Sequence, residues 1–195
     1  MRRVCVFCGS NVGTRREYAE AARVLAAVLV ERKLGIVYGG GNVGLMGVLA
    51  DAALERGGEV IGVIPQTLVD KEVAHRGVTE LMVVGTMHER KARMNDLSDA
   101  FIALPGGFGT LDEFFEVLTW SQLGFHGKPC ALLNVAGYYD PMLAMLDHAV
   151  AERFLRPAHH ELVITDSEPS RLLRRLSAFV PSTKAKWSDA KGNFL

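Results

Sequence analysis

The chain has 195 residues, of which 49% are apolar and 23% charged, and its 22 basic and 22 acidic residues cancel to a formal net charge of zero. This length fits one domain and is enough to bury a full core without disulfides. The neutral balance argues against a nucleic-acid-binding protein, which carries a basic excess. No apolar run approaches the ~20 residues that span a bilayer. Glycine is in excess, with 20 residues, about 10% against a usual ~7%.

The N-terminal segment is basic and then apolar, but its apolar stretch ends at Gly9. That stretch is too short for the core of a signal peptide. The three cysteines are an odd number, which argues against a secreted disulfide scaffold. We therefore expect a cytoplasmic protein that neither binds nucleic acid nor enters a membrane.

Short β-rich segments alternate with helical stretches along the chain. In order, the pattern predicts strand 4–8, helix 14–32, strand 34–38, helix 45–55, strand 60–64, strand 81–84, helix 87–97, strand 100–104, helix 111–123, strand 131–134, helix 141–152, strand 162–165 and helix 169–179. Because the strands are apolar throughout and separated by helices, we expect an α/β fold with a doubly wound parallel sheet covered on both faces. Residues 1–180 are predicted to form a single domain, followed by a polar C-terminal tail, 181–195.

The glycines concentrate directly after three predicted strands. Segments 9–13, 39–44 and 106–109 are glycine-rich, and the second and third each open a helix. Glycine lets backbone N–H groups approach an anion closely, and a helix N-terminus adds a favourable dipole. Parallel sheets bind ligands at the carboxyl ends of their strands. The pattern therefore indicates a phosphate-bearing ligand, while tight turns and close helix packing are the alternative use of these glycines.

Residues 39–44 match the pattern G-x-G-x-x-G. This dinucleotide fingerprint normally follows the first strand, and an acidic residue that binds the ribose ends the next strand. Here the glycines follow the second predicted strand, and the next strand ends in Ile64, Pro65 and Gln66. The sequence also lacks a P-loop pattern, so neither NAD binding nor a P-loop nucleotidase is favoured.

Thr110 and Glu113 have T-x-x-E spacing at a predicted helix start. One interpretation is a capping box, in which Thr110 accepts from the Glu113 N–H and Glu113 reaches back. The other is that Glu113 points its carboxylate at a bound ligand. The spacing alone leaves both interpretations open.

The predicted helix 87–97 carries Arg90, Lys91 and Arg93 near its N-terminus. Cations there oppose the helix dipole, at a cost of ~0.3–1 kcal/mol each at exposed sites. They form either a solvated face partly offset by Glu89 or a set of cations that a ligand anion compensates. Arg90 suits the second reading best, because a guanidinium binds oxyanions in a bidentate manner.

Cysteine and histidine show no metal-binding pattern, and the one redox-like motif, Cys5-x-x-Cys8, lies on a predicted strand, whereas a redox C-x-x-C normally opens a helix. Cys5 and Cys8 lie three apart on a predicted strand, so their thiols face opposite sides of the sheet. His88-Glu89 lacks the second histidine of a zinc-protease motif, and His159-His160 stand alone. We therefore expect the cysteines to be structural and no metal site.

The segment from Pro105 to Glu113 resembles the P-G-G-x-G-T-x-x-E signature of the LONELY GUY family. These proteins are cytokinin riboside 5′-monophosphate phosphoribohydrolases, often mislabelled as lysine decarboxylases. Residues 8–10, 39–47 and 87–91 also agree with the family, and the likeness runs from about residue 3 to residue 180. The tail lies outside the shared core.

The resemblance implies a Rossmann-like fold, a homodimer, and hydrolysis of the N-glycosidic bond of a nucleoside 5′-monophosphate to a free base and ribose 5-phosphate. It implies no metal or cofactor. Carried over by position, Arg90 and Glu113 are the catalytic pair. The substrate contacts are Ser10, Gly40, Gly41, Glu72, Arg90, Lys91, Gly107, Phe108, Gly109, Thr110, Leu111, Asp112, Glu113 and Thr119.

Three alternatives remain open. The first is a general purine-nucleotide hydrolase acting on AMP, which a single sequence does not separate from the cytokinin enzyme. The second is a non-catalytic nucleotide or cofactor carrier, which would not need the Arg90 and Glu113 pair. The third is a decarboxylase, which would use pyridoxal phosphate on a lysine. No lysine here stands in a recognisable pyridoxal-phosphate motif.

Overall fold

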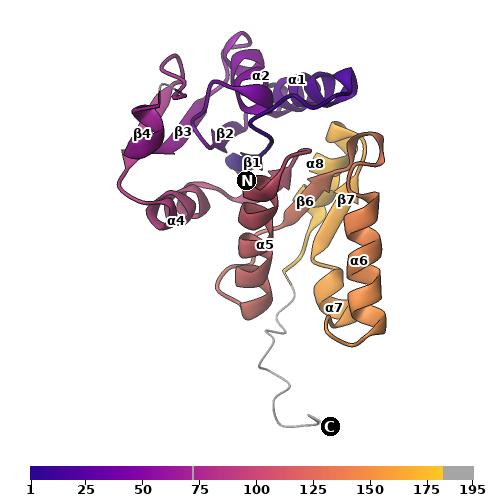
Figure 1. Ribbon diagram of the computed structural model, residues 1–195. Helices are drawn as coiled ribbons and strands as arrows, with labels where there is room; N and C mark the ends of the chain where they lie inside the picture. The colour runs from indigo at the N-terminus through magenta and orange to yellow at the C-terminus, as the bar shows by residue number, and fades with distance from the viewer. Residues whose placement is uncertain (72, 182–195) are drawn as a thin grey trace.

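The computed structural model describes residues 1–71 and 73–181 (Figure 1). The predicted substrate contact at Glu72 and nearly all of the predicted tail lie outside the described residues.

The described residues form a seven-stranded sheet in which every neighbouring pair of strands is parallel. The strands are β1 (Arg3–Phe7), β2 (Gly35–Tyr38), β3 (Val60–Pro65), β4 (Glu80–Val84), β5 (Ala100–Ala103), β6 (Cys130–Leu133) and β7 (Val163–Asp166). Their spatial order is β4-β3-β2-β1-β5-β6-β7. The predicted doubly wound α/β sheet is therefore confirmed.

Helices cover both faces of this sheet (Figure 1). They are α1 (Arg16–Glu31), α2 (Gly44–Leu54), α3 (Gln66–Val69), α4 (Met87–Leu97), α5 (Phe108–Leu123), the 3-10 turn η1 (Val135–Gly137), α6 (Asp140–Ala151), α7 (Pro157–His160) and α8 (Pro169–Ala178). The predicted long helices are all present. The turns α3, α7 and η1 were not predicted, because a single turn is too short to show a helical period.

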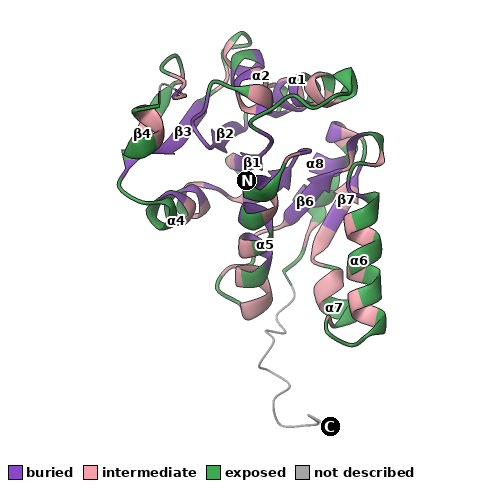
Figure 2. Cartoon of the chain, in the orientation of Figure 1, coloured by how far each residue is buried: buried purple, intermediate pink, exposed green. Residues whose placement is uncertain are grey.

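The core consists of two apolar clusters, one on each face of the sheet. Val4 and Val6 pack with residues of α1, α2 and α8, whereas Cys5 and Phe7 pack with residues of α4 and α5. This division follows from the alternation of side chains along a strand. In Figure 2 the inner strands are buried, while α6 contains no buried residue.

The prediction that the Cys5 and Cys8 thiols face opposite sides of the sheet is confirmed. Cys5 and Cys8 lie in opposite core clusters, and both are free. Burial raises the pKa of each thiol above its ordinary value. Both cysteines therefore serve as small apolar core residues rather than as a redox pair.

In the described ranges, no helix combines the length and apolar character that crossing a lipid bilayer requires.

The sheet order creates one position where a ligand site is expected. Strands β2, β3 and β4 follow β1 in the chain and lie successively farther from it on one side. Strand β5 lies next to β1 on the other side. The loops that follow β1 and β5 therefore leave the sheet in opposite directions. In open α/β sheets, ligands bind in the crevice at this reversal of strand order.

Candidate active site

The three glycine-rich turns meet at the carboxyl ends of β1, β2 and β5. The Gly9 N–H donates to the Pro105 carbonyl at 3.0 Å, and the Leu45 N–H donates to the Gly9 carbonyl at 3.0 Å. Gly44 has a φ of +60°, and a Cβ there would lie 2.2 Å from the carbonyl carbon of Ser10. This close approach requires glycine, and it confirms that the three turns share one edge of the sheet.

A pocket of about 200 Å³ lies between these turns. It is lined by Val6, Phe7, Cys8, Gly9, Ser10, Gly39, Met46, Arg90, Gly107, Phe108, Gly109, Thr110 and Glu113. The pocket thus contains the predicted catalytic pair. It also contains five further predicted substrate contacts, which are Ser10 and residues 107–110. The backbone amides at the start of α5 belong to the same wall, and the first amides of a helix have no acceptor within it.

Arg90 of α4 and Glu113 of α5 form a buried ion pair in this pocket. Arg90 Nη1 donates to Glu113 Oε1 at 2.5 Å, and each residue is only 8% exposed. Arg90 Nε also donates to the Val63 carbonyl at 3.0 Å. The guanidinium is therefore held at two points, by a strand end and by the neighbouring helix.

Gly39 makes room for this guanidinium. A Cβ at Gly39 would lie 2.2 Å from Arg90 Nη2, which is closer than any real Cβ contact. The observed position of the guanidinium therefore depends on a glycine directly after β2. Sequence reasoning counted Gly39 only as part of a phosphate-binding turn.

The electrostatics of Glu113 are set by burial and by its partner. Burial raises the pKa of the Glu113 carboxyl, and the charges of Arg90 and Lys91 oppose part of that rise. A buried carboxyl at which these influences compete is suited to exchange a proton or to stabilise a nearby positive charge.

The capping-box interpretation of Thr110 and Glu113 is wrong. Helix α5 begins at Phe108, three residues before the predicted start, and its N-cap is Gly107 without a side-chain cap. Both residues therefore lie inside the helix, and the Glu113 carboxylate accepts from Arg90 instead. The early start was missed because the flanking glycines indicate a loop.

A cap with the same T-x-x-E spacing, related to a capping box, is present at the start of α4, where Thr86 is the N-cap. Thr86 Oγ1 accepts from the Glu89 N–H at 3.1 Å, and Glu89 Oε2 accepts from the Gly85 N–H at 2.9 Å. The T-x-x-E signal directly precedes the predicted helix 87–97, so it was available in the sequence and was missed.

Two of the three predicted cations of α4, Arg90 and Lys91, form ion pairs with α5. Lys91 Nζ lies 2.8 Å from Asp112 Oδ2 and 3.4 Å from Glu116 Oε2 on α5. Arg90 is paired with Glu113. Two parallel sets of ion pairs therefore join α4 to α5 beside the pocket.

The remaining predicted contacts lie around the pocket or away from it. The turn containing Gly40 and Gly41 pairs with segment 73–75. The His75 N–H donates to the Gly40 carbonyl at 2.8 Å. Leu111 packs against the core cluster of α4 and α5. Thr119 is exposed farther along α5, and its hydroxyl donates to the Phe115 carbonyl at 2.7 Å. This chain alone does not bring Thr119 to the pocket.

Sequence reasoning missed several residues that shape the site. Met46 lines the pocket, and Val63 contributes the carbonyl that holds Arg90. Tyr138 and Tyr139 donate from their hydroxyls to carbonyls of the loop between β5 and α5. No sequence signal marks these contacts, because they depend on the three-dimensional path of the chain.

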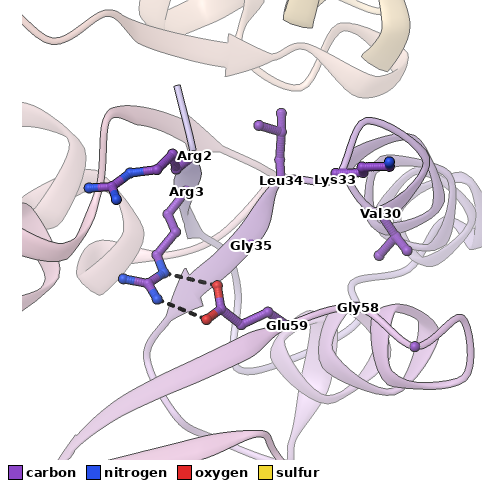
Figure 3. Close-up of a pocket in the computed structure, with 9 residues that line it drawn as sticks. Arg2, Arg3, Val30, Lys33, Leu34, Gly35, Gly58 and Glu59 are labelled. Carbon is purple, nitrogen blue, oxygen red and sulfur yellow. Dashed lines mark hydrogen bonds and ion pairs between the residues drawn. The ribbon is translucent and has the colours of Figure 1, made fainter.

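A larger hollow of about 450 Å³ lies at the opposite, amino-terminal edge of the sheet (Figure 3). There, Arg3 pairs with Glu59 through two hydrogen bonds of 2.9 and 2.8 Å. None of the predicted site residues lines this hollow. Within residues 1–71 and 73–181, no group of three or more His, Cys, Asp or Glu side chains is arranged to hold a metal ion.

Solved structures share this fold. A molybdenum cofactor binding protein from Rippkaea orientalis superposes with a TM-score of 0.69 at 21% identity, covering 91% of this chain and 97% of that chain. A molybdenum cofactor carrier protein from Chlamydomonas reinhardtii gives a TM-score of 0.68 at 21% identity, covering 91% and 99%. At such low identity these likenesses show the fold alone, which is the expected Rossmann-like one.

Sequence comparison identifies much nearer relatives. Residues 46–176 match a family model described as "possible lysine decarboxylase". The chain is 55% identical over 180 residues to the probable cytokinin riboside 5′-monophosphate phosphoribohydrolase LOGL9 of Oryza sativa subsp. japonica, covering 92% of this chain and 79% of that protein. It is 47% identical over 195 residues to the enzyme LOG5 of Arabidopsis thaliana, covering 97% and 86%. The chain therefore belongs to the family of the cytokinin riboside 5′-monophosphate phosphoribohydrolases.

Proposed function

We propose that this protein hydrolyses the N-glycosidic bond of cytokinin riboside 5′-monophosphates, releasing the free base and ribose 5-phosphate. This reaction is the one in the names of its relatives from rice and Arabidopsis. The observation that carries the proposal is the buried Arg90–Glu113 pair, which faces a pocket walled by the N-terminus of α5.

The start of α5 is the proposed anchor for the 5′-phosphate. Gly107, Phe108, Gly109 and Thr110 form the N-cap and first turn, where amides lack helical acceptors and the helix dipole favours an anion. A Cβ at Gly107 or at Gly109 would meet no atom within 4 Å, so the backbone there is open to a ligand. Binding the phosphate at this remote point positions the sugar for reaction.

Glu113 is the proposed catalytic carboxylate. Cleavage of the bond between C1′ and the base nitrogen passes through an oxocarbenium-like state that needs negative charge or an activated water nearby. The water oxygen bonds to C1′, one water proton goes to the departing base, and the other stays as the hydroxyl of ribose 5-phosphate. Glu113 stabilises the positive C1′ or accepts the water proton and passes it on. Arg90 holds the carboxylate in place and favours its ionised form against the effect of burial.

The same pair favours an enzyme over a carrier. A carboxylate buried beside the sugar would repel a phosphate. A protein that only stores a nucleotide or cofactor therefore gains nothing from such a carboxylate. The proposed site also includes Ser10 in the wall and Gly40, Gly41, Lys91, Asp112 and Thr119 around it, on the strength of the family signature.

We also propose a homodimer in the cytoplasm. Helix α6 is rich in apolar residues, yet it buries none, and Met145 on it is 70% exposed. A second copy packed on this helix would cover that surface. The three cysteines Cys5, Cys8 and Cys130 are free thiols, as is usual in a reducing compartment.

The test is incubation of the purified protein with isopentenyladenosine 5′-monophosphate, AMP and isopentenyladenosine, followed by chromatography for free base. We expect base from isopentenyladenosine 5′-monophosphate and little from the riboside that lacks phosphate. Equal release from the riboside would contradict the phosphate anchor. Release from AMP at the same rate would favour a general purine-nucleotide hydrolase, and binding without any release would favour a carrier.

A further inference from the structure

Two adjacent tyrosines reach from the segment after β6 to the loop that joins β5 to α5, residues 104–107. The Tyr138 hydroxyl donates to the Gly106 carbonyl at 2.6 Å, and the Tyr139 hydroxyl donates to the Leu104 carbonyl at 2.6 Å. Between them, the Pro105 carbonyl accepts from the Gly9 N–H at 3.0 Å. Three successive carbonyls of the loop are therefore each held by a donor from elsewhere in the chain.

A strained turn presents these tyrosines. Ala136 has a φ of 52° and Gly137 a φ of 72°, and the first of these is unusual for a residue with a side chain. The Asn134 side chain fixes the turn, because its oxygen accepts from the Tyr139 N–H at 2.8 Å and its amide donates to Asp140 at 2.7 Å. The ring of Tyr138 also packs edge-on against Tyr139, with centroids 5.0 Å apart. The position of the Tyr138 hydroxyl is thus set by its own neighbours.

Holding the Gly106 carbonyl also fixes the direction of the next N–H, because both groups belong to one planar peptide. In a trans peptide, the carbonyl of one residue and the N–H of the next point in opposite directions, and the described chain contains no cis peptide. By holding the Gly106 carbonyl, Tyr138 therefore turns the Gly107 N–H away from itself. Tyr139 aims no amide, because the residue after Leu104 is Pro105, which has no N–H.

We propose that Tyr138 is a positioning residue that fixes the Gly106–Gly107 peptide with its N–H directed at the 5′-phosphate. This rests on the proposed function, which places the phosphate at the start of α5. The peptide lies between two glycines, whose backbone rotates more freely than that of any other residue. Without the hydroxyl, this peptide is free to turn, and the site loses one preorganised donor to the anion.

The test compares Tyr138→Phe with two matched hydroxyl deletions. Ribose 5-phosphate binding is measured by calorimetry, and KM and kcat are measured with isopentenyladenosine 5′-monophosphate. We expect Tyr138→Phe to weaken ribose 5-phosphate binding and to raise KM by roughly 3- to 10-fold, with kcat changed by less than about twofold and an unchanged Tm. The ring of Tyr18 packs edge-on against Tyr138. Tyr18→Phe should leave the affinity for ribose 5-phosphate and the KM unchanged. Tyr139→Phe removes a buried hydroxyl bond, so it should lower Tm and change ribose 5-phosphate affinity by less than about twofold.

The outcomes separate this inference from the function on which it rests. Equal affinity of Tyr138→Phe and wild type for ribose 5-phosphate would overturn the positioning role while leaving the hydrolase intact. Equal losses of affinity in Tyr138→Phe and Tyr139→Phe would also overturn it, since they would show only a loosened loop. A wild-type protein that binds no ribose 5-phosphate and releases no base would overturn the proposed function itself.

Discussion

Arg90 Nη1 and Glu113 Oε1 are 2.5 Å apart, in a place where each residue is only 8% exposed. The two residues are 23 positions apart in the chain and come from different helices, α4 and α5. Burying two charges is costly unless they compensate each other. The proposed catalytic role of Glu113 gives a reason for keeping this charged pair in a buried place.

Removing Arg90 should destabilise the fold. Arg90→Met leaves the Glu113 carboxylate buried without its counter-charge, so we expect the free energy of unfolding to fall by about 3–5 kcal/mol. The measurement is urea denaturation at neutral pH. The control is Arg3→Met, because the Arg3–Glu59 pair is solvent-accessible, with side chains 35% and 42% exposed (Figure 3). That pair should contribute less than about 1 kcal/mol, and equal losses in the two variants would contradict a buried, compensated pair.

Filling the space at Gly39 should displace the arginine. In Gly39→Ala the new methyl group would meet Arg90 Nη2, so the guanidinium that pairs with Glu113 must shift. Misplacing catalytic groups by about 1 Å can cost ~10²-fold in rate, and we expect a loss of that order in kcat/KM. Gly85→Ala is the matched control, since its methyl group would make an ordinary contact of 3.5 Å with Glu89. Full activity in Gly39→Ala would show that the Arg90 position is not critical.

The raised pKa of Glu113 predicts the acidic side of the pH profile. If the ionised carboxylate is the active form, kcat/KM falls as pH decreases through this pKa of the free protein, at a pH above the ~4.3 of an unperturbed glutamate. A midpoint at or below ~4.3 would contradict this prediction.

Stability should respond to the same group with a defined sign. A carboxyl whose pKa is raised by folding contributes stability below its unfolded pKa, and this is lost as pH rises through the folded pKa. Glu113→Gln has no such titration. The wild type should therefore lose stability relative to Glu113→Gln as pH increases, which urea denaturation at several pH values would measure.

The sequence predicted the framework well, because strand and helix periods are local signals. The bounds of α4, Met87–Leu97, match the predicted range, and every predicted strand is present. The start of α5 was predicted three residues too late, because Gly107 and Gly109 look like a loop. The N-cap and the first turn of this helix nevertheless accommodate both glycines.

The candidate site was predicted as residues but not as geometry. The family signature gave Arg90 and Glu113, yet neither spacing nor composition indicated that they bond to each other. Likewise, nothing in the sequence indicated that Lys91 pairs with Asp112. Such pairs depend on how α4 and α5 pack across the sheet, and a single sequence carries no signal for contacts of this kind.

The Thr86 N-cap of α4 gives a test that is independent of catalysis. Thr86→Ala removes the acceptor of the Glu89 N–H, and we expect the free energy of unfolding to fall by about 1 kcal/mol. Ser177→Ala is the control, because its hydroxyl donates to the Leu173 carbonyl within a helix and caps no end. A larger loss in Ser177→Ala than in Thr86→Ala would contradict the capping role.

The most direct test of the account is Glu113→Gln, which keeps the shape of the side chain and removes its charge. The measurement pairs binding of isopentenyladenosine 5′-monophosphate with release of free base, for the variant and the wild type. The account predicts that the variant still binds the nucleotide while base release is lost. Base release at the wild-type rate would contradict the assignment of Glu113 as the catalytic carboxylate.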